Sequence, residues 1–388
     1  MTSHSLRERQ FLRRLEQERF GRRLDSKARK LVRDRRDSGY RPLKARMPSR
    51  FETDRFVATA QKDKPRSVDL LLPKLMDLLN NYEETAEFIR DIRRTALGDR
   101  RYVRIVFDNA ERIRPAALLL LLAEINRCRM IHGPNAVTGT YPKNKALERM
   151  LENTGFFGVL NVKPRNPERT RVYPVEFIKF RSDNKLDSAE PRRLREELLG
   201  SNITMHPKAR TRLYRAITEA MLNVGQHAYP AYALRTHPTR GRWWVAGQVN
   251  KRKGEMMITF CDLGVGIPDT LPKVYPWELI RAVLAILPGV NPNDGQMIQA
   301  GMAIGRTRTK EIHRGRGLND LRSFIDQAGA GELHILSRKG RYTYSPGNEE
   351  MLHNYGISMG GTLIKWSVPL RNVTNWVEEE GHDVDGDN

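Results

Sequence analysis

Three polar side chains recur at intervals of four in the stretch LYRAITEAMLNVGQH, residues 213–227: Glu219, Asn223 and His227. Apolar residues of this stretch recur at helical spacing, so we expect a helix that carries the three polar side chains on a separate face. An amide one turn from a carboxylate suits metal–nucleotide chemistry. Asn223 offers a neutral oxygen to Mg²⁺, and Glu219 can orient or deprotonate a water or a hydroxyl group. A solvent-facing polar stripe is the alternative interpretation.

A second motif follows an apolar strand that we expect over residues 257–261. The strand ends at Asp262, and Gly264 and Gly266 come within the next four residues. An acid at a strand end can accept a hydrogen bond from an exocyclic amine such as that of adenine. Glycines there let the backbone pass close beneath a ring. An ordinary turn would also account for the two glycines.

Two further glycine motifs lie downstream. The sequence GRGL, residues 315–318, precedes a predicted helix over 319–328, and a glycine pair at a helix start presents free backbone N–H groups to phosphate. Gly360-Gly361-Thr362 leads into a predicted strand over 363–368, where the threonine can hydrogen-bond the base region. A solvated basic loop and a glycine bulge are the respective alternatives. Four basic side chains precede GRGL and could neutralise the charge of a triphosphate: Arg306, Arg308, Lys310 and Arg314.

The elements that must position these motifs follow from the sequence pattern. Residues 243–250 and 255–262 read as two strands joined by the turn KRKG, a hairpin that favours an antiparallel sheet over a Rossmann crossover. A long segment, residues 268–314, separates the second motif from the third and contains a predicted helix over 277–287. We expect this segment to act as a mobile lid.

In this order and context the four motifs resemble those of the GHKL superfamily of ATPases, which includes gyrase, Hsp90, histidine kinases and MutL. EAMLNVGQHA (219–228) is similar to the histidine-kinase form of the N box. DLGVGI (262–267), GRGL (315–318) and GT (361–362) match the remaining nucleotide boxes. The resemblance covers about residues 200–370. It implies a Bergerat fold, an α/β sandwich with helices over one face of a mixed, largely antiparallel sheet and ATP between the layers.

The resemblance also implies a role for each matching residue. Glu219 would be the general base, Asn223 the Mg²⁺ ligand, and Asp262 the partner of the adenine amine. Gln226 departs from the pattern, since a basic residue often stands there, and this puts one phosphate contact in doubt. The other implied nucleotide-binding residues are His227, Gly264, Gly266, Ile267, Gly315, Arg316, Gly317, Leu318, Gly361 and Thr362.

Residues 67–162 predict a smaller α/β domain. Its expected elements are helices over 68–82, 116–131 and 143–153 and strands over 102–107 and 136–140. IVFDNAERIRPAALLLLLAEI (105–125) and VTGTYPKNKALERMLENTGFFGVLNV (137–162) resemble a STAS domain, the fold of anti-sigma-factor antagonists. Antagonists carry a phosphorylatable serine at the start of the helix that follows, but Arg114-Pro115-Ala116-Ala117 has no hydroxyl group. This departure argues against switching by phosphorylation within the chain.

The chain has 388 residues and a formal net charge of +22, which at first suggests a nucleic-acid binder. Residues 1–66 hold 21 Lys and Arg against 9 Asp and Glu, a net charge of +12 from 21 − 9. They predict a basic helical arm that contacts nucleic acid, an acidic partner or an anionic membrane surface, or packs on the protein itself or on a second copy. A connector is expected over 163–199, the ATPase domain over 200–372 and an acidic disordered tail over 373–388.

Several functional classes are disfavoured. Two cysteines far apart cannot supply a disulfide framework, and the longest apolar run, residues 115–123, is too short to cross a bilayer. We therefore expect a cytoplasmic protein without a membrane span. A sensor kinase would need a phosphoacceptor histidine, and His206 lacks the acidic neighbour; a residue at a helix start before Pro207 is the alternative.

The predicted function is that of an ATP-binding regulator, in which Mg-ATP binding with slow hydrolysis closes the lid and switches contacts with a protein partner. One alternative is an anti-sigma-type serine/threonine kinase that acts on a separate antagonist. A second is a nucleic-acid-binding regulator with ATP as ligand. The sequence leaves open whether the chain forms a homodimer.

Overall fold

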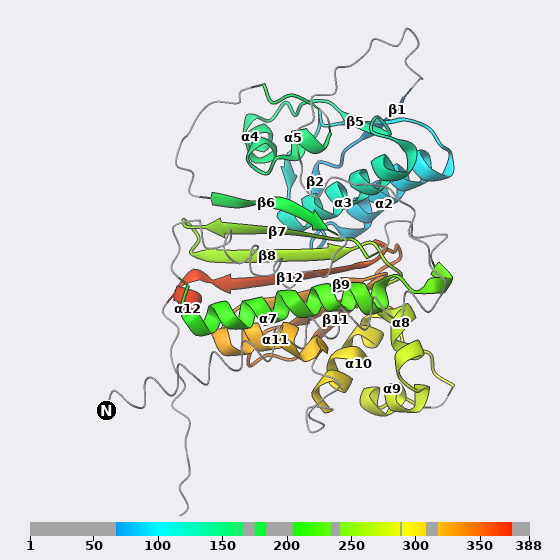
Figure 1. Ribbon diagram of the computed structural model, residues 1–388, viewed down its shortest axis with the longest axis vertical. Helices are drawn as coiled ribbons and strands as arrows, with labels where there is room; N and C mark the ends of the chain where they lie inside the picture. The colour runs from blue at the N-terminus through cyan, green and yellow to red at the C-terminus, as the bar shows by residue number, and fades with distance from the viewer. Residues whose placement is uncertain are drawn as a thin grey trace, which may run out of the picture.

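The computed structural model describes residues 67–160, 162–165, 175–183, 205–233, 241–287, 289–307 and 317–374. The predicted arm over 1–66, Gly315 and Arg316, most of the connector and residues 375–388 of the acidic tail lie outside these ranges. The described chain has a mixed α/β architecture built around one large sheet (Figure 1). Among the described helices, none combines the length and the apolarity that a bilayer crossing needs. Both cysteines are buried free thiols.

The large sheet has seven strands in the order β11-β10-β9-β12-β8-β7-β6, and every neighbouring pair is antiparallel. The sequence led us to expect a mixed, largely antiparallel sheet. The antiparallel character is confirmed, whereas the mixed character is wrong for the described strands, because this sheet contains no parallel pair among them. The predicted hairpin is confirmed residue for residue as β7 and β8. The bounds are β6 Val175–Asp183, β7 Trp243–Asn250, β8 Glu255–Asp262, β9 Glu332–Ser337, β10 Gly340–Tyr344, β11 Met351–Asn354 and β12 Thr362–Pro369.

One face of the large sheet is covered by two helices, α7 (Pro207–Asn223) and α11 (Gly317–Ala328). Alternate residues of β8, such as Ile258 and Phe260, share a core with the apolar stripe of α7. The indole N–H of Trp366 on β12 donates to the carbonyl oxygen of Leu321 at 2.8 Å. A buried indole N–H needs such a partner, so this bond fixes α11 against the sheet.

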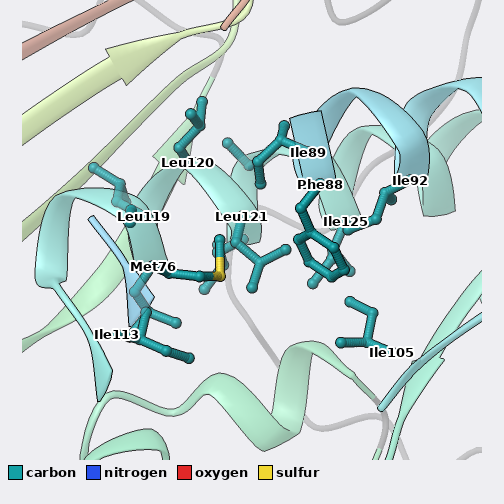
Figure 2. Close-up of a cluster of buried hydrophobic side chains, with 14 of the residues drawn as sticks. Met76, Phe88, Ile89, Ile92, Ile105, Ile113, Leu119, Leu120, Leu121 and Ile125 are labelled. Carbon is teal, nitrogen blue, oxygen red and sulfur yellow. The ribbon is translucent and has the colours of Figure 1, made fainter. Parts of the chain in front are cut away.

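Residues 67–160 form an N-terminal unit of their own strands and helices. This unit contains a parallel sheet in the order β1-β3-β5 and a short parallel pair, β2 with β4. Both share an apolar core with the central helix α3. Figure 2 shows the side chains that pack between them, including Phe88, Ile105 and Leu121. The bounds are β1 Val68–Leu71, β2 Leu75–Met76, α2 Tyr82–Arg93, β3 Val103–Val106, β4 Arg112–Ile113, α3 Pro115–His132, β5 Val137–Gly139, α4 Lys145–Asn153 and α5 Phe156–Val159.

The helix predicted over residues 68–82 is wrong. The chain forms β1, then β2, and helix α2 begins only at Tyr82. Pro73 lies in the middle of the predicted span, where it removes a helical hydrogen bond and disfavours helical backbone in the residue before it. The remaining predicted elements of this unit are confirmed, and α3 starts at Pro115, whose missing N–H is harmless in a first helical turn.

Helix α3 joins the N-terminal unit to the large sheet. Residues 118–122 are fully buried, as the sequence predicted for a core helix. They belong to one continuous apolar core with side chains from the sheet face opposite α7, among them Trp244, Cys261 and Leu363. The two units therefore share a core, and the large sheet is covered on both faces.

The segment after β8 is helical along much of its length. It contains α8 (Ile267–Val274), α9 (Trp277–Leu284) and α10 (Asp294–Thr307), of which only α9 was predicted. Figure 1 shows these helices gathered at the end of the sheet where β8 finishes. A small apolar cluster of their own, with Leu271, Ile280 and Ile304, holds them together. The remaining short helical elements of the described chain are η1 (Arg94–Gly98), η2 (Val224–Ala228), η3 (Ala231–Ala233) and α12 (Leu370–Thr374).

Candidate functional site

Helix α7 begins with a cap made by a histidine. The Nδ1 atom of His206 accepts a hydrogen bond from the backbone N–H of Lys208 at 3.2 Å, and Pro207 is the first helical residue. The cap satisfies one of the N–H groups that a helix start leaves without a partner. His206 thus occupies the helix-start position that was the alternative to a phosphoacceptor.

The polar face of α7 is separate from its buried stripe. Leu213, Ile217 and Met221 are buried against the sheet, whereas Glu219, Asn223 and His227 are each partly exposed. After Asn223 the helix changes to a π-helical turn, η2 (Val224–Ala228), which carries the end of the EAMLNVGQHA motif. Single π turns are frequent at functional sites.

Asn223 carries an unusual polar atom. Its Nδ2 is shielded from solvent and has no hydrogen-bond partner in the described part of the chain. Buried donors without a partner are rare in folded proteins, and each costs free energy unless a ligand or water satisfies it. The indole N–H of Trp243, at the start of β7, is also shielded from solvent and also has no hydrogen-bond partner in the described part of the chain. A water molecule or a bound group with acceptor atoms would satisfy such a donor.

Four side chains form a row across the end of the large sheet. Ser337 on β9 lies directly opposite Thr362 on β12, Thr362 lies opposite Asp262 on β8, and Asp262 lies opposite Trp243 on β7. Asp262 follows Ile258 and Phe260 at intervals of two, so it points to the face that α7 covers. The antiparallel register therefore brings together residues from motifs that are about 100 positions apart in sequence.

Asp262 is a buried carboxyl group, with 5% of the residue exposed. Burial raises its pKa to about 7, while hydrogen bonds from the backbone N–H groups of Gly264 and Thr362 act in the opposite direction. The bond from Gly264 reaches Oδ1 at 2.8 Å. A buried acid with a strongly shifted pKa is typical of functional sites, since a fold gains no stability from burying it. An amine or ring N–H donor on a ligand would stabilise the ionised form.

The glycines of the second and fourth motifs pack too tightly for a side chain. A Cβ atom on Gly264 would stand 2.2 Å from the carbonyl oxygen of Ala228, and one on Gly361 would stand 2.1 Å from that of Asp262. The backbone N–H of Val265 donates to the same Ala228 oxygen at 2.9 Å. The loop after β8 is thus held directly against the π turn of α7 on one side and against the start of β12 on the other.

Ser337 connects the site to the lid. Its hydroxyl oxygen accepts a hydrogen bond from the N–H of Ile267, the first residue of α8, at 2.9 Å. It also lies 3.2 Å from the carbonyl oxygen of Gly361 and 3.0 Å from the hydroxyl oxygen of Thr362. Gly266 has a φ of 89°, and a Cβ on it would stand 2.8 Å from the Ser337 hydroxyl oxygen. Ser337 therefore holds the backbone of Gly266 and Ile267, from which the lid segment continues.

The third motif is described only from Gly317, the first residue of α11. Leu318 is half-buried and packs on the same core as Ile267, and its Cδ1 would lie 3.0 Å from a Cβ placed on Gly301 of α10. Gly315 and Arg316 lie outside the described residues, as do the side chains of the four basic residues that precede them. Helix α11 thus begins beside the base of the lid.

The structure brings most of the predicted residues into one region. Asp262, Gly264, Gly266, Ile267, Gly361 and Thr362 are linked by direct contacts and register. His227 lies on η2, whose Ala228 contacts Gly264, and Glu219 and Asn223 lie on the last turns of α7 that lead into η2.

Sequence reasoning missed Ser337, Trp243 and Tyr229. The Tyr229 hydroxyl donates to the carbonyl of Arg242 at 2.9 Å and accepts from the N–H of Leu263 at 3.1 Å. No motif marks these residues, because Ser337 and Trp243 reach the site through cross-strand register and Tyr229 through hydrogen bonds from the segment after η2.

A metal would have few protein ligands here. The described residues contain no cluster of three or more His, Cys, Asp or Glu side chains placed to hold an ion. Mg²⁺ in nucleotide sites is usually held by one or two protein oxygens together with phosphate and water, so Asn223 and Glu219 fit that ion better than they fit zinc.

Neither the known protein-family models nor the curated proteins give a match to this chain.

Proposed function

We propose that this protein binds Mg-ATP at the end of the large sheet and uses the bound nucleotide to change the state of its lid. The row Ser337–Thr362–Asp262–Trp243 carries the proposal, because a buried carboxyl group with a raised pKa stands there beside close-packed glycines. Ionised Asp262 would accept a hydrogen bond from the exocyclic amine of adenine, and the close-packed Gly264 and Gly361 would fix the backbone beside that carboxyl group.

The arrangement of the motifs supports membership of the GHKL class and a Bergerat fold. The order N-box helix, hairpin, lid, helix and terminal strands matches the order that the sequence resemblance implies, and α7 and α11 share one face of an antiparallel sheet. The N-terminal unit, with parallel strands and α3, is compatible with the proposed STAS-like domain.

Each proposed role uses chemistry available at its position. Asn223 would offer its side-chain oxygen to Mg²⁺, and its orphaned Nδ2 would donate to a bound acceptor. Glu219, one helical turn earlier, would orient or deprotonate a water molecule, which gives slow hydrolysis. The half-exposed position of both residues keeps them accessible to a ligand. His227 and Leu318 would contribute to the rim, and Gly315, Arg316 and Gly317 would present N–H groups to phosphate.

A binding experiment with the full chain tests the proposal. Isothermal titration with Mg-ATP should give saturable binding, and Asp262→Asn and Asn223→Ala should each weaken it at least tenfold, about the effect of one lost hydrogen bond to a charged group. Asp99→Asn, an exposed acid after α2, is the matched control and should bind like the wild type. Unchanged Mg-dependent binding in Asn223→Ala would overturn the site assignment.

A second measurement separates hydrolysis from phosphotransfer. Incubation with γ-labelled ATP, alone and with cell lysate, should release free phosphate at a rate that Glu219→Gln abolishes. A labelled lysate protein would instead support the serine/threonine kinase alternative, in which Glu219 acts on a protein hydroxyl group. Binding without either product would leave ATP as a ligand only.

A further inference from the structure

Helix α2 of the N-terminal unit packs on, and hydrogen-bonds to, the segment that leads into the fourth motif. This segment, residues 355–361, runs from the end of β11 to the start of β12. The ring of Tyr82 stacks on Tyr355 with centroids 3.6 Å apart. The Tyr82 hydroxyl accepts from the N–H of Met359 at 3.1 Å and lies within hydrogen-bond distance of the carbonyl oxygens of Arg338 and Ile357. One side chain therefore organises three backbone groups of the sheet.

A second residue of α2 binds the same segment from its side. The carboxylate of Glu83 accepts a hydrogen bond from the backbone N–H of Gly356 at 2.7 Å. Bonds between a carboxylate and a backbone N–H are among the stronger hydrogen bonds in proteins. Both ends of the segment are thus tied to α2, since Arg93 holds the other end.

Arg93, at the end of α2, reaches the glycine pair itself. Its Nη2 donates to the carbonyl oxygen of Met359 at 3.2 Å, and a Cβ on Gly360 would stand 2.9 Å from both terminal nitrogens. The guanidinium is held in place by Glu124 of α3, which is fully buried and 3.0 Å away at its closest. Arg127, one turn along α3, pairs with the same carboxylate. The guanidinium that supports the glycine pair is therefore anchored in the core of the N-terminal unit.

We infer that Arg93 and Tyr82 are positioning residues for nucleotide binding: docking of α2 on residues 355–361 sets the backbone of Gly361 and Thr362, and through them the environment of Asp262. The inference rests on the proposed function for its ligand. The path is short, because Gly361 accepts a hydrogen bond from the N–H of Arg338 at 3.2 Å and the N–H of Thr362 bonds to Asp262. Neither Arg93 nor Tyr82 belongs to the row that would contact the base.

The physical consequence is a coupling between the N-terminal unit and the nucleotide. If α2 docking favours the binding-competent turn, bound nucleotide must favour α2 docking by the same factor. Arg338 extends the path to the lid, because its guanidinium pairs with Asp269 of α8 and its backbone contacts the same segment. A partner that displaced α2 would therefore release nucleotide and loosen the lid together.

The experiment compares two arginines that share one carboxylate. Arg93→Gln and Arg127→Gln each remove one of the two cations paired with Glu124, but only Arg93 contacts the turn in the described structure. We expect Mg-ATP affinity to fall about tenfold in Arg93→Gln and by less than about twofold in Arg127→Gln, at temperatures where both remain folded. Arg93→Lys, which keeps the charge but loses the forked geometry, should recover only part of the affinity.

Amide hydrogen exchange in the absence of nucleotide gives an independent readout. Protection of the N–H groups of residues 359–362 should fall in Arg93→Gln and in Tyr82→Phe, and should stay at the wild-type level in Arg127→Gln. Equal affinity losses in the two arginine variants, or unchanged exchange in Arg93→Gln, would overturn the inference. A wild-type protein that binds no nucleotide would overturn the proposed function instead, and the exchange result would then stand or fall separately.

Discussion

Gly361 lies against Asp262 so closely that a Cβ on the glycine would stand 2.1 Å from the aspartate carbonyl oxygen. The two residues belong to motifs separated by the whole lid, and they meet because β12 pairs with β8 from Thr362 and Asp262 onward. Gly361 also has a φ of 86°, a conformation that side chains with a Cβ rarely adopt. The position excludes every residue except glycine on two independent grounds.

Gly361→Ala should therefore destabilise the protein by about 3 kcal/mol, from strain in φ together with overpacking. The free energy of unfolding from denaturant titration measures this change. Gly347→Ala is a matched control, since Gly347 has a φ of 75° but a Cβ there would meet no atom within 4 Å. It should cost only about 1 kcal/mol. Equal costs at the two positions would contradict the close packing at Gly361.

The buried carboxyl group of Asp262 should make stability fall as pH rises. Burial raises its pKa from the ordinary value of 3.8 to about 7, so between these values the folded state binds more protons at this residue than the unfolded state does. The contribution of Asp262 then decreases by up to about 1.4 kcal/mol per pH unit from about pH 4 to about pH 7.

Asp262→Asn removes this titration. Relative to the wild type, the variant should gain stability progressively from pH 4 to pH 7 and level off above, as followed by denaturant unfolding at several pH values. A stability difference that does not change with pH would show that Asp262 is not held in a desolvated site. The same variant should bind Mg-ATP more weakly although it is more stable at neutral pH. The weaker binding therefore cannot be explained by a loss of stability.

Ser337→Ala should weaken the base of the lid. The substitution leaves the part-buried N–H of Ile267 without its acceptor, at a cost of about 1 kcal/mol. We expect faster amide exchange at Ile267 and faster proteolysis within α8 to α10, with β7 and β8 unaffected. Ser323→Ala, which removes a local hydroxyl contact within α11, is the control and should change stability by less than about 0.5 kcal/mol. Similar lid proteolysis in both variants would contradict the role of Ser337.

The prediction for the basic arm, residues 1–66, rests on the sequence alone. Residues 1–66 carry a net charge of +12, from 21 basic and 9 acidic side chains. If the arm binds nucleic acid, removal of residues 1–50 should abolish most retention on immobilised DNA or RNA, and retention of the full chain should fall steeply with salt. Mg-ATP affinity should not change. Retention that survives the truncation would place nucleic-acid binding outside residues 1–50.

Local signals in the sequence predicted many elements correctly. The hairpin of β7 and β8 follows from two β-rich runs around a short polar turn, and α3 follows from a proline in its first turn before an apolar run. The helix predicted over 68–82 failed because apolar periodicity outweighed Pro73 in the interpretation. The sequence interpretation also missed α8 and α10, because α8 contains Pro272 within its span and α10 contains three glycines, residue types that argue against a helix.

The sequence by itself determined which residues could do chemistry. The spacing of Glu219 and Asn223, the acid at Asp262 and the glycines at 264, 266 and 361 are properties of residue type and local conformation, so they can be read without a fold. Tertiary structure alone decided the rest. The row that joins Ser337 and Trp243 to Asp262, and the contact of Arg93 with the turn at Gly360, depend on strand register and on the shared core at α3. Such contacts join residues far apart in the chain, and no local pattern encodes which of them meet.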